Sequence, residues 1–485
     1  MTDGNREQFF LGQAPEYAAL CLILLGSLAC ASARAEDSAQ SGGSSLGVAS
    51  GPNPEQGLPI GGWIVYPSFY SGAVFNDNVY NSATNKQGAV GIDLRPSFIA
   101  TLDNGIYKTQ SYFGLDAQIY PGSNGAGGSL AAVYGANGGT TSASNVQGRA
   151  GFSQIYQPLP DLTFTAAFDF SRLLGLFGTG FGVGGQAPSL YVPNGVVASG
   201  LPLISNQLTG SLSVQKEITD RAFVAWQGGV QGVIFDSRPS SGIVSVFSPE
   251  STQQNGVNLT TSVRLGYWVG PMVYAYVEPG GSFRRYQNSL SDTNGYRVVG
   301  GLGSDQIGLF KGEIYGGYQS QSSANGQAGV GANSPAFGGR LSYYPTPYLT
   351  VSASADESLG STTPSSVSNG LVSSPLVNPF LAIAVSPATS SRAFQSMLQA
   401  DYAFSQYWSA HVRGGYGETL YTNSSRVDST WMAGVGGSYT FWRNLAFTVG
   451  YQFSRIDSSN ANIWSPFSGS RYSQNIVTAG VTYNY

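Results

Sequence analysis

The sequence predicts an all-β protein, a transmembrane antiparallel up-and-down β-barrel of about 18 strands (16–18). Three observations predict this class. Charged residues make up only 10% of the 485 residues, whereas aromatic residues reach 13% and glycines number 66; ordinary soluble proteins are about a quarter charged. Hydrophobicity alternates with a period of two along most of the chain. Short and long connections alternate between the strands, as in barrels that have tight periplasmic turns and long extracellular loops.

The composition also excludes several kinds of chemistry. The net charge is −4, so no basic footprint for nucleic acid is present. Both cysteines precede residue 31 and the chain has one histidine. Cysteine-ligated metals, disulfide scaffolds and Cys–His nucleophile pairs are therefore not expected in the mature protein, and no cofactor or metal is predicted. Beyond residue 31 no run of about 18 apolar residues suggests a membrane-spanning helix.

Residues 1–35 resemble a secretory signal peptide. An apolar stretch from Tyr17 to Ala31 precedes Ala33-Arg34-Ala35, a small-x-small cleavage site. Before this stretch the single arginine, Arg6, is outnumbered by Asp3, Glu7 and Glu16, which is a departure from ordinary signals. A lipoprotein signal that uses Cys30 is the alternative. Cleavage after Ala35 predicts an exported mature chain.

Residues 36–59 are rich in Ser, Gly, Pro and Gln and contain almost no bulky side chain. This composition is typical of a flexible segment, so we expect a disordered periplasmic leader. The barrel is then expected to span residues 60–485.

The strands are predicted from the alternation of apolar and polar residues. The clearest example runs from Leu445 to Arg455, where Leu, Phe, Val, Tyr and Phe alternate with Ala, Thr, Gly, Gln and Ser. Such a period places one set of side chains on each face of a strand. The strands are expected to begin near residues 63, 88, 106, 144, 162, 204, 221, 255, 273, 293, 307, 335, 349, 391, 408, 428, 444 and 473.

Short turns rich in Pro, Gly, Asn and Asp separate pairs of these strands, and aromatic residues gather beside them, as in the interfacial girdles of barrels. The final residues, Tyr483-Asn484-Tyr485, resemble the aromatic-terminated last strand that the bacterial barrel-assembly machinery reads. The predicted turns are Asp103-Asn104-Gly105, Pro158-Leu159-Pro160-Asp161, Ile218-Thr219-Asp220-Arg221, Gly270-Pro271, Ser304-Asp305, Pro345-Thr346-Pro347, Ser405-Gln406-Tyr407 and Trp442-Arg443-Asn444.

If the apolar faces contact lipid, most ionisable residues of the strands fall on the opposite face and line the lumen. An ionisable side chain that faces hydrocarbon costs roughly 2–4 kcal/mol, so this segregation supports the barrel. Two interpretations stay open: mutual neutralisation by cross-strand pairs, and a transverse field that orients solutes. The predicted pore-lining residues are Arg95, Arg149, Arg264, Arg284, Arg297, Lys311, Arg340, Arg413, His411, Asp93, Asp116, Asp169, Glu278, Glu313, Asp356 and Asp401.

Two long connections contain more apolar residues than a solvated loop needs. The segment from Leu173 to Leu203 is rich in glycine and carries Leu174, Phe177 and Phe181. We expect this constriction loop to fold into the barrel, with capping of the outer mouth or a subunit contact as the alternatives. The segment from Leu359 to Ser390 is a candidate for a second plug or lid.

No catalytic residue is predicted. The single His411 is two residues from Arg413 on the same face, and a lone lumen histidine is far more often structural or pore-lining. Asp356 and Glu357 lie on opposite faces of a strand, where two carboxylates cannot cooperate. Asn76-Asp77-Asn78 is interpreted as a turn, because a cation site would need further carboxylates at regular spacing.

Three segments near the start of the predicted barrel are similar to one family of Gram-negative outer-membrane proteins. They are Leu58-Pro59-Ile60-Gly61-Gly62-Trp63-Ile64-Val65-Tyr66-Pro67-Ser68, Asn76-Asp77-Asn78-Val79-Tyr80 and Asp93-Leu94-Arg95-Pro96-Ser97. Together they resemble the putative β-barrel porin 2 family. The resemblance implies an outer-membrane barrel, often encoded beside genes for polysaccharide synthesis and export. It carries over no catalytic residues.

These observations predict a protein of the bacterial outer membrane that lets small hydrophilic solutes diffuse passively, as a porin does. Two alternatives stay open: a barrel accessory to exopolysaccharide export, and a plugged structural barrel. The expected partners are outer-membrane lipid, lipopolysaccharide and the barrel-assembly machinery. A homotrimer and a bound polysaccharide are left open.

Overall fold

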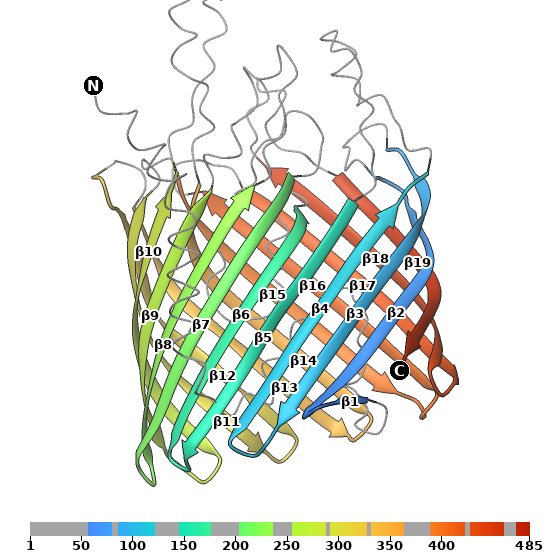
Figure 1. Cartoon of the computed structure of the whole chain (residues 1–485). Helices are drawn as coiled ribbons and strands as arrows, with labels where there is room; N and C mark the ends of the chain where they lie inside the picture. The colour runs from blue at the N-terminus through green and yellow to red at the C-terminus, as the bar shows by residue number, and fades with distance from the viewer. Residues whose placement is uncertain are drawn as a thin grey trace, which may run out of the picture.

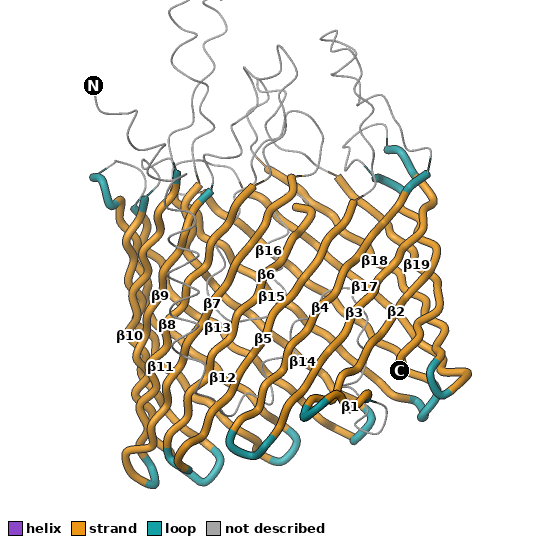
Figure 2. Tube along the Cα trace, viewed as in Figure 1, coloured by secondary structure: helices purple, strands orange, loops and turns teal. Residues whose placement is uncertain are grey.

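The computed structural model describes residues 57–79, 86–121, 145–175, 203–235, 255–287, 292–326, 331–362, 389–421, 427–459 and 472–485. These residues form a tilted, closed wall of strands (Figures 1 and 2). No helix long and apolar enough to cross a membrane occurs in these ranges. The strands are β1 (Leu58–Ile60), β2 (Trp63–Asn76), β3 (Ala89–Asp103), β4 (Tyr107–Ile119), β5 (Asn145–Leu159), β6 (Leu162–Gly175), β7 (Leu203–Thr219), β8 (Ala222–Phe235), β9 (Gly256–Trp268), β10 (Val273–Tyr286), β11 (Thr293–Ile307), β12 (Phe310–Ser323), β13 (Ala332–Thr346), β14 (Leu349–Thr362), β15 (Thr389–Ala403), β16 (Trp408–Tyr421), β17 (Val427–Trp442), β18 (Leu445–Ser459) and β19 (Tyr472–Asn484).

The wall is an 18-stranded antiparallel barrel made of β2 to β19. Each strand pairs with the next one along the chain, and β19 returns to pair with β2, from Ser68↔Asn484 to Asn76↔Ile476. Closure leaves no open edge, so every strand has a neighbour on both sides. The predicted fold class is therefore confirmed.

The strand positions agree closely with those expected from the sequence. Each barrel strand begins within three residues of its predicted start, and the largest differences are at Phe310 and Ala332. One predicted turn, Ser304-Asp305, is wrong because β11 continues to Ile307, with a register shift after Ser304. The chain turns instead at Gly308, whose φ of 61° is in the left-handed region that glycine adopts without strain.

A short strand, β1, precedes the barrel strands. Gly57 to Pro59, assigned to the leader from the sequence, are part of the described structure, and β1 pairs with the start of β2 through Leu58↔Val65 and Ile60↔Trp63. This short strand continues the ladder at the point where β19 ends, since the amide of Tyr485 donates to the carbonyl of Pro67 at 3.1 Å. Figure 1 shows β1 and the C-terminus at the same end of the barrel, the end with the short turns.

The outer face of the wall is apolar because every second side chain points outward. On β18, Phe447, Val449 and Tyr451 are 46%, 49% and 41% exposed. Exposed apolar side chains in the same alternating positions occur on most of the other strands. A belt of this kind belongs in hydrocarbon, so the opposite faces enclose the lumen.

Candidate functional site: the lumen

The ionisable residues predicted for the pore lie on the lumen face of their strands. In β3, for example, Asp93 and Arg95 alternate with the exposed Val90 and Ile92. In β16, His411 and Arg413 alternate with the exposed Val412. The same alternation places the rest of the predicted set in β4 to β6 and β9 to β15. Their role in conducting a solute stays a prediction.

The most extensive lumen cluster is centred on Arg264 of β9. Its Nε is 2.7 Å from Glu278 Oε2, and its Nη1 is 2.8 Å from Glu313 Oε2. The guanidinium carbon lies 4.0 Å from the centre of the Tyr276 ring. The hydroxyl of Tyr276 donates to Glu313 Oε1 at 2.8 Å. One cation is therefore shared by two carboxylates from β10 and β12 while it stacks on a ring between them, and the cluster as a whole keeps one negative charge.

A second cluster repeats this arrangement in β4 to β6. The guanidinium of Arg149 lies 5.1 Å from the Tyr112 ring centre and forms an ion pair of 2.6 Å with Asp169. The hydroxyl of Tyr112 donates to the same carboxylate. The cluster contains one positive and one negative group, so it is neutral.

Two further arginines stack on tyrosine rings. Arg95 lies 4.9 Å from the Tyr70 ring centre, pairs with Asp93 and is 3.4 Å from Asp116. Arg297 is 4.7 Å from the Tyr315 ring centre, and the hydroxyl of Tyr315 donates to Asp356. The described strands thus carry four arginine–tyrosine clusters on the lumen wall.

Glycine makes room for these rings on the neighbouring strand. A Cβ atom added to Gly301 would lie 2.7 Å from Cε1 of Tyr276, closer than a carbon can approach. The ring therefore lies flat against the backbone of β11. This close approach explains part of the high glycine content, because a larger residue would push the ring into the lumen.

Three further lumen arginines are not neutralised in this way. Within the described strands, Arg284, Arg340 and Arg413 form no ion pair within 4 Å; Arg284 donates instead to Gln321 Oε1 at 2.6 Å and Arg413 to Gln452 Oε1 at 2.8 Å. Three arginines are thus held by carboxylates, whereas Arg284, Arg340 and Arg413 are not. Whether the lumen charges orient a solute stays a prediction.

The sequence indicated tyrosine among the lumen residues, but it did not single out the tyrosines that stack on arginine, although the alternation could have located them. Tyr112, Tyr276 and Tyr315 occupy the same alternate positions as the lumen charges, so their residue numbers place them on the lumen face. The ionisable residues were assigned to the lumen because a charged side chain in hydrocarbon costs several kcal/mol. The contacts between these rings and the arginines depend on strand register, which the alternation does not give.

The two predicted long connections are only partly described. Leu174 belongs to β6 and Leu359 to β14, so both strands extend further than expected. Phe177 and Phe181 lie outside the described residues, so the predicted constriction stays untested.

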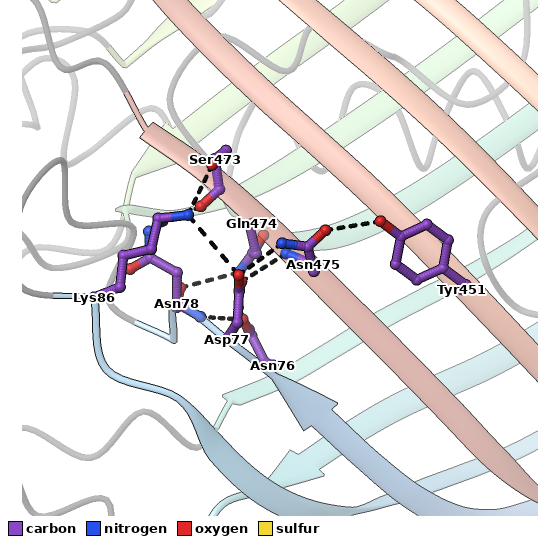
Figure 3. A network of polar contacts seen from close by, with 8 residues as sticks. All are labelled: Asn76, Asp77, Asn78, Lys86, Tyr451, Ser473, Gln474 and Asn475. Carbon is purple, nitrogen blue, oxygen red and sulfur yellow. Dashed lines mark hydrogen bonds and ion pairs between the residues drawn. The ribbon is translucent and has the colours of Figure 1, made fainter.

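The motif Asn76-Asp77-Asn78 joins the first and last barrel strands (Figure 3). Asp77 accepts hydrogen bonds from the backbone N–H and the side-chain amide of Asn475, both at 2.6 Å. The amide of Asn78 donates to the carbonyl of Ser473 at 3.1 Å, and Gln474 donates to Asn76 Oδ1 at 3.2 Å. The motif thus links β2 to β19 at the barrel seam, the place where the first and last barrel strands meet. Its side chains hydrogen-bond to other groups of the protein.

The closed wall, its apolar outer belt and its ionisable interior define a transmembrane β-barrel. Residues 189–377 match the family model Putative beta-barrel porin 2, and residues 291–485 match the model Outer membrane protein beta-barrel domain. Each model matches about two fifths of the chain, so over these residues the chain is similar to outer-membrane β-barrels of the Putative beta-barrel porin 2 family, a class that is typically non-enzymatic. The matched residues lie further along the chain than the segments between Leu58 and Ser97 that carry the resemblance.

Several solved barrels are similar to the chain. The outer membrane protein opdK from Pseudomonas aeruginosa is 10% identical, with a TM-score of 0.39 over 87% of this chain and 99% of that one. The outer membrane channel DcaP of Acinetobacter baumannii is 11% identical, with a TM-score of 0.39 over 89% and 100%. An anion-selective porin from Comamonas acidovorans is 11% identical, with a TM-score of 0.32 over 87% and 99%. These barrels differ too much from the chain to indicate its solute. No curated protein sequence matches the chain.

Proposed function

We propose that the protein is a porin-like channel through which small hydrophilic solutes diffuse passively. The observation that carries this proposal is the closure of 18 strands into one barrel with an ionisable interior. Barrels of 16–18 strands enclose more space than the side chains of their own walls fill, so they leave an aqueous channel. Charged groups on the inner face are then hydrated, which avoids the cost of placing them in lipid.

The lumen charges favour a weakly selective channel. The three arginines that carry ion pairs contribute no net positive field, because the carboxylates beside them outnumber them. Arg284, Arg340 and Arg413, which form no such ion pair, lie on β10, β13 and β16. A negatively charged solute that passes them is weakly attracted.

Single-channel conductance in a planar bilayer tests the proposal. The purified, refolded chain is expected to give steady ohmic steps. A variant that lacks residues 178–200, and so retains β6 and β7, is expected to give larger steps if this segment narrows the pore. Steps of unchanged size would refute the constriction, and silence in both proteins would refute the channel itself.

The substitution Arg413→Gln is expected to shift ion selectivity toward cations. Removal of one unit of charge from a water-filled lumen changes the interaction with a passing ion by about 1 kcal/mol or less, which corresponds to a two- to fivefold change in permeability ratio. The reversal potential in a salt gradient measures this ratio. Arg443→Gln, in the turn after β17, is the control and should leave the ratio unchanged. Equal ratios in the parent and Arg413→Gln would show that Arg413 does not face the conducting path.

A further inference from the structure

One part of the barrel wall departs from regular pairing. β13 and β14 pair from Thr346↔Leu349 only as far as Gly338↔Asp356, although both strands continue for several residues toward the end with the long loops. Each stays paired on its other side, β13 with β12 up to Ala332 and β14 with β15 up to Thr362. The wall is therefore divided between residues 332–337 and residues 357–362.

The two unpaired segments overlap. Ser334 is on the lumen face of β13, since it pairs with Gln319, whereas Glu357 is on the membrane face of β14, opposite Phe394 of β15. Nevertheless the hydroxyl of Ser334 donates to the carboxylate of Glu357. A lumen-facing side chain of one strand can reach a membrane-facing side chain of the next only if β14 lies on the lumen side of β13.

Further contacts agree with this overlap. Gln319 Nε2 on the lumen face of β12 donates to the carbonyls of Pro335 and Glu357, at 3.2 and 3.4 Å. Ala336 and Leu359, which face each other across the overlap by their positions in the strands, are 0% and 7% exposed. On the outer side the rings of Phe337 and Phe394, from β13 and β15, have centroids 6.0 Å apart.

Opening of the overlap would break few contacts. No backbone ladder links its two segments, and Pro335 has no N–H to donate to one. By contrast, β19 and β2 share a continuous ladder of nine residue pairs. Outward movement of β13 from β14 would separate Ser334 and Gln319 from Glu357 and would expose Leu359.

The outer side of the overlap combines phenylalanine rings with one arginine. Phe337 and Phe394 form its outer rim. Behind them the buried Glu357 is held by Arg392, whose Nε is 2.7 Å from Oε1 and whose Nη2 is 2.8 Å from Oε2. The Arg392 side chain is 41% exposed, and its place in β15, two residues from Phe394, puts it on the membrane face.

From these contacts we propose that the overlap of β13 and β14 is a side passage between the lumen and the outer half of the membrane, used by a single-chain amphiphile with an anionic headgroup. The headgroup, a carboxylate or a phosphate, pairs with Arg392 while the alkyl chain stays among the phenylalanine rings. Opening exposes Glu357 to the water of the lumen, so neither charge is left in lipid. This route is separate from axial diffusion through the barrel.

The opening is tested by cysteine accessibility in the full chain with Cys21 and Cys30 replaced by serine. Leu359→Cys is compared with Ile456→Cys, which is 3% exposed in the parent and sits between intact ladders of β17 and β19, away from the overlap. N-ethylmaleimide in a non-ionic detergent is expected to label position 359 at least about tenfold faster, because local opening exposes it. Glu357→Gln should raise that rate further. Equal rates at positions 359 and 456 would refute the opening. If Leu359→Cys does not fold, Ala336→Cys reports from the opposite side of the overlap.

The occupant is tested with a twelve-carbon carboxylic acid that carries a photoreactive diazirine on its tail. Crosslinks are expected on β13 to β15, and Arg392→Gln should reduce them about tenfold, since one charged pair is lost. Arg455→Gln is the matched control, because Arg455 also lies on the membrane face, pairs with Asp457 at 2.6 Å and sits in intact ladders.

Competition separates the sources of the headgroup. Laurate alone, or dodecyl phosphate alone, is expected to displace the probe, and dodecyl maltoside is not. Equal crosslinking in Arg392→Gln and the parent, or equal competition by dodecyl maltoside, would overturn the proposal. Conductance of the Arg392→Gln protein should equal that of the parent, so failure of the side passage is distinguishable from failure of the channel.

Discussion

Arg264→Leu is expected to destabilise the folded barrel by about 2–4 kcal/mol. The substitution removes the shared partner of Glu278 and Glu313 and leaves two carboxylates close together in the half-buried interior. Breaking a buried ion pair costs 3–5 kcal/mol, and partial exposure of these side chains to the lumen reduces that figure. Loss of the stacking on Tyr276 adds to the effect. Urea unfolding in detergent micelles measures the change.

Two variants show whether the effect comes from unpaired charge. The triple variant Arg264→Leu/Glu278→Gln/Glu313→Gln should recover most of the lost stability, because no uncompensated carboxylate remains. Arg413→Leu removes a lumen arginine that donates to an amide, Gln452, and should cost only about 1 kcal/mol. If Arg264→Leu is no more destabilising than Arg413→Leu, the cluster does not contribute to the stability of the wall.

Asp77→Ala is expected to destabilise the barrel by about 1–3 kcal/mol at its seam. The change leaves the backbone N–H of Asn475 without an acceptor at a half-buried position. It also removes the contact with the Asn475 side chain and a 3.8 Å ion pair with Lys86. Samples are heated to stepwise higher temperatures and run on a denaturing gel. The temperature at which the compact, fast-migrating form disappears measures the effect.

Asp103→Ala provides the comparison for the seam. Asp103 also accepts a backbone N–H, that of Gly105 at 2.8 Å, but within one turn. Its replacement should change the transition little, because the turn joins neighbours that are already linked along the chain. Equal shifts for Asp77→Ala and Asp103→Ala would argue that Asp77 acts only on its own turn.

The sequence predicted the barrel closely because the membrane constrains each strand separately. Alternation at Leu445–Arg455 and similar stretches fixes both the strand and its two faces, without knowledge of its neighbours. The same logic placed Asp93, Arg264 and His411 on the lumen face. Turn residues then set the order of short and long connections.

Features that depend on how neighbouring strands meet were not predicted. The overlap of β13 and β14 depends on the mutual position of Ser334, Gln319 and Glu357, which lie on three strands. Pro335 was a local signal for it, since proline within a strand indicates an edge or an interruption. Glu357, an acidic residue on a membrane face, was a second. The arginine–tyrosine clusters likewise depend on register, which alternation alone does not supply.

The barrel seam has a consequence for engineering of the chain order. All other strand pairs join neighbours in the sequence, whereas β2 and β19 join residues about 400 positions apart, as in the contact of Ser68 with Asn484. β1 and the C-terminus lie at the same end of the barrel (Figure 1). A linker between them would turn the seam into an ordinary hairpin, and a cut in any other connection would create a new one. The order of strands around the barrel would be the same in such a permuted chain, and only the positions of the two chain ends would differ.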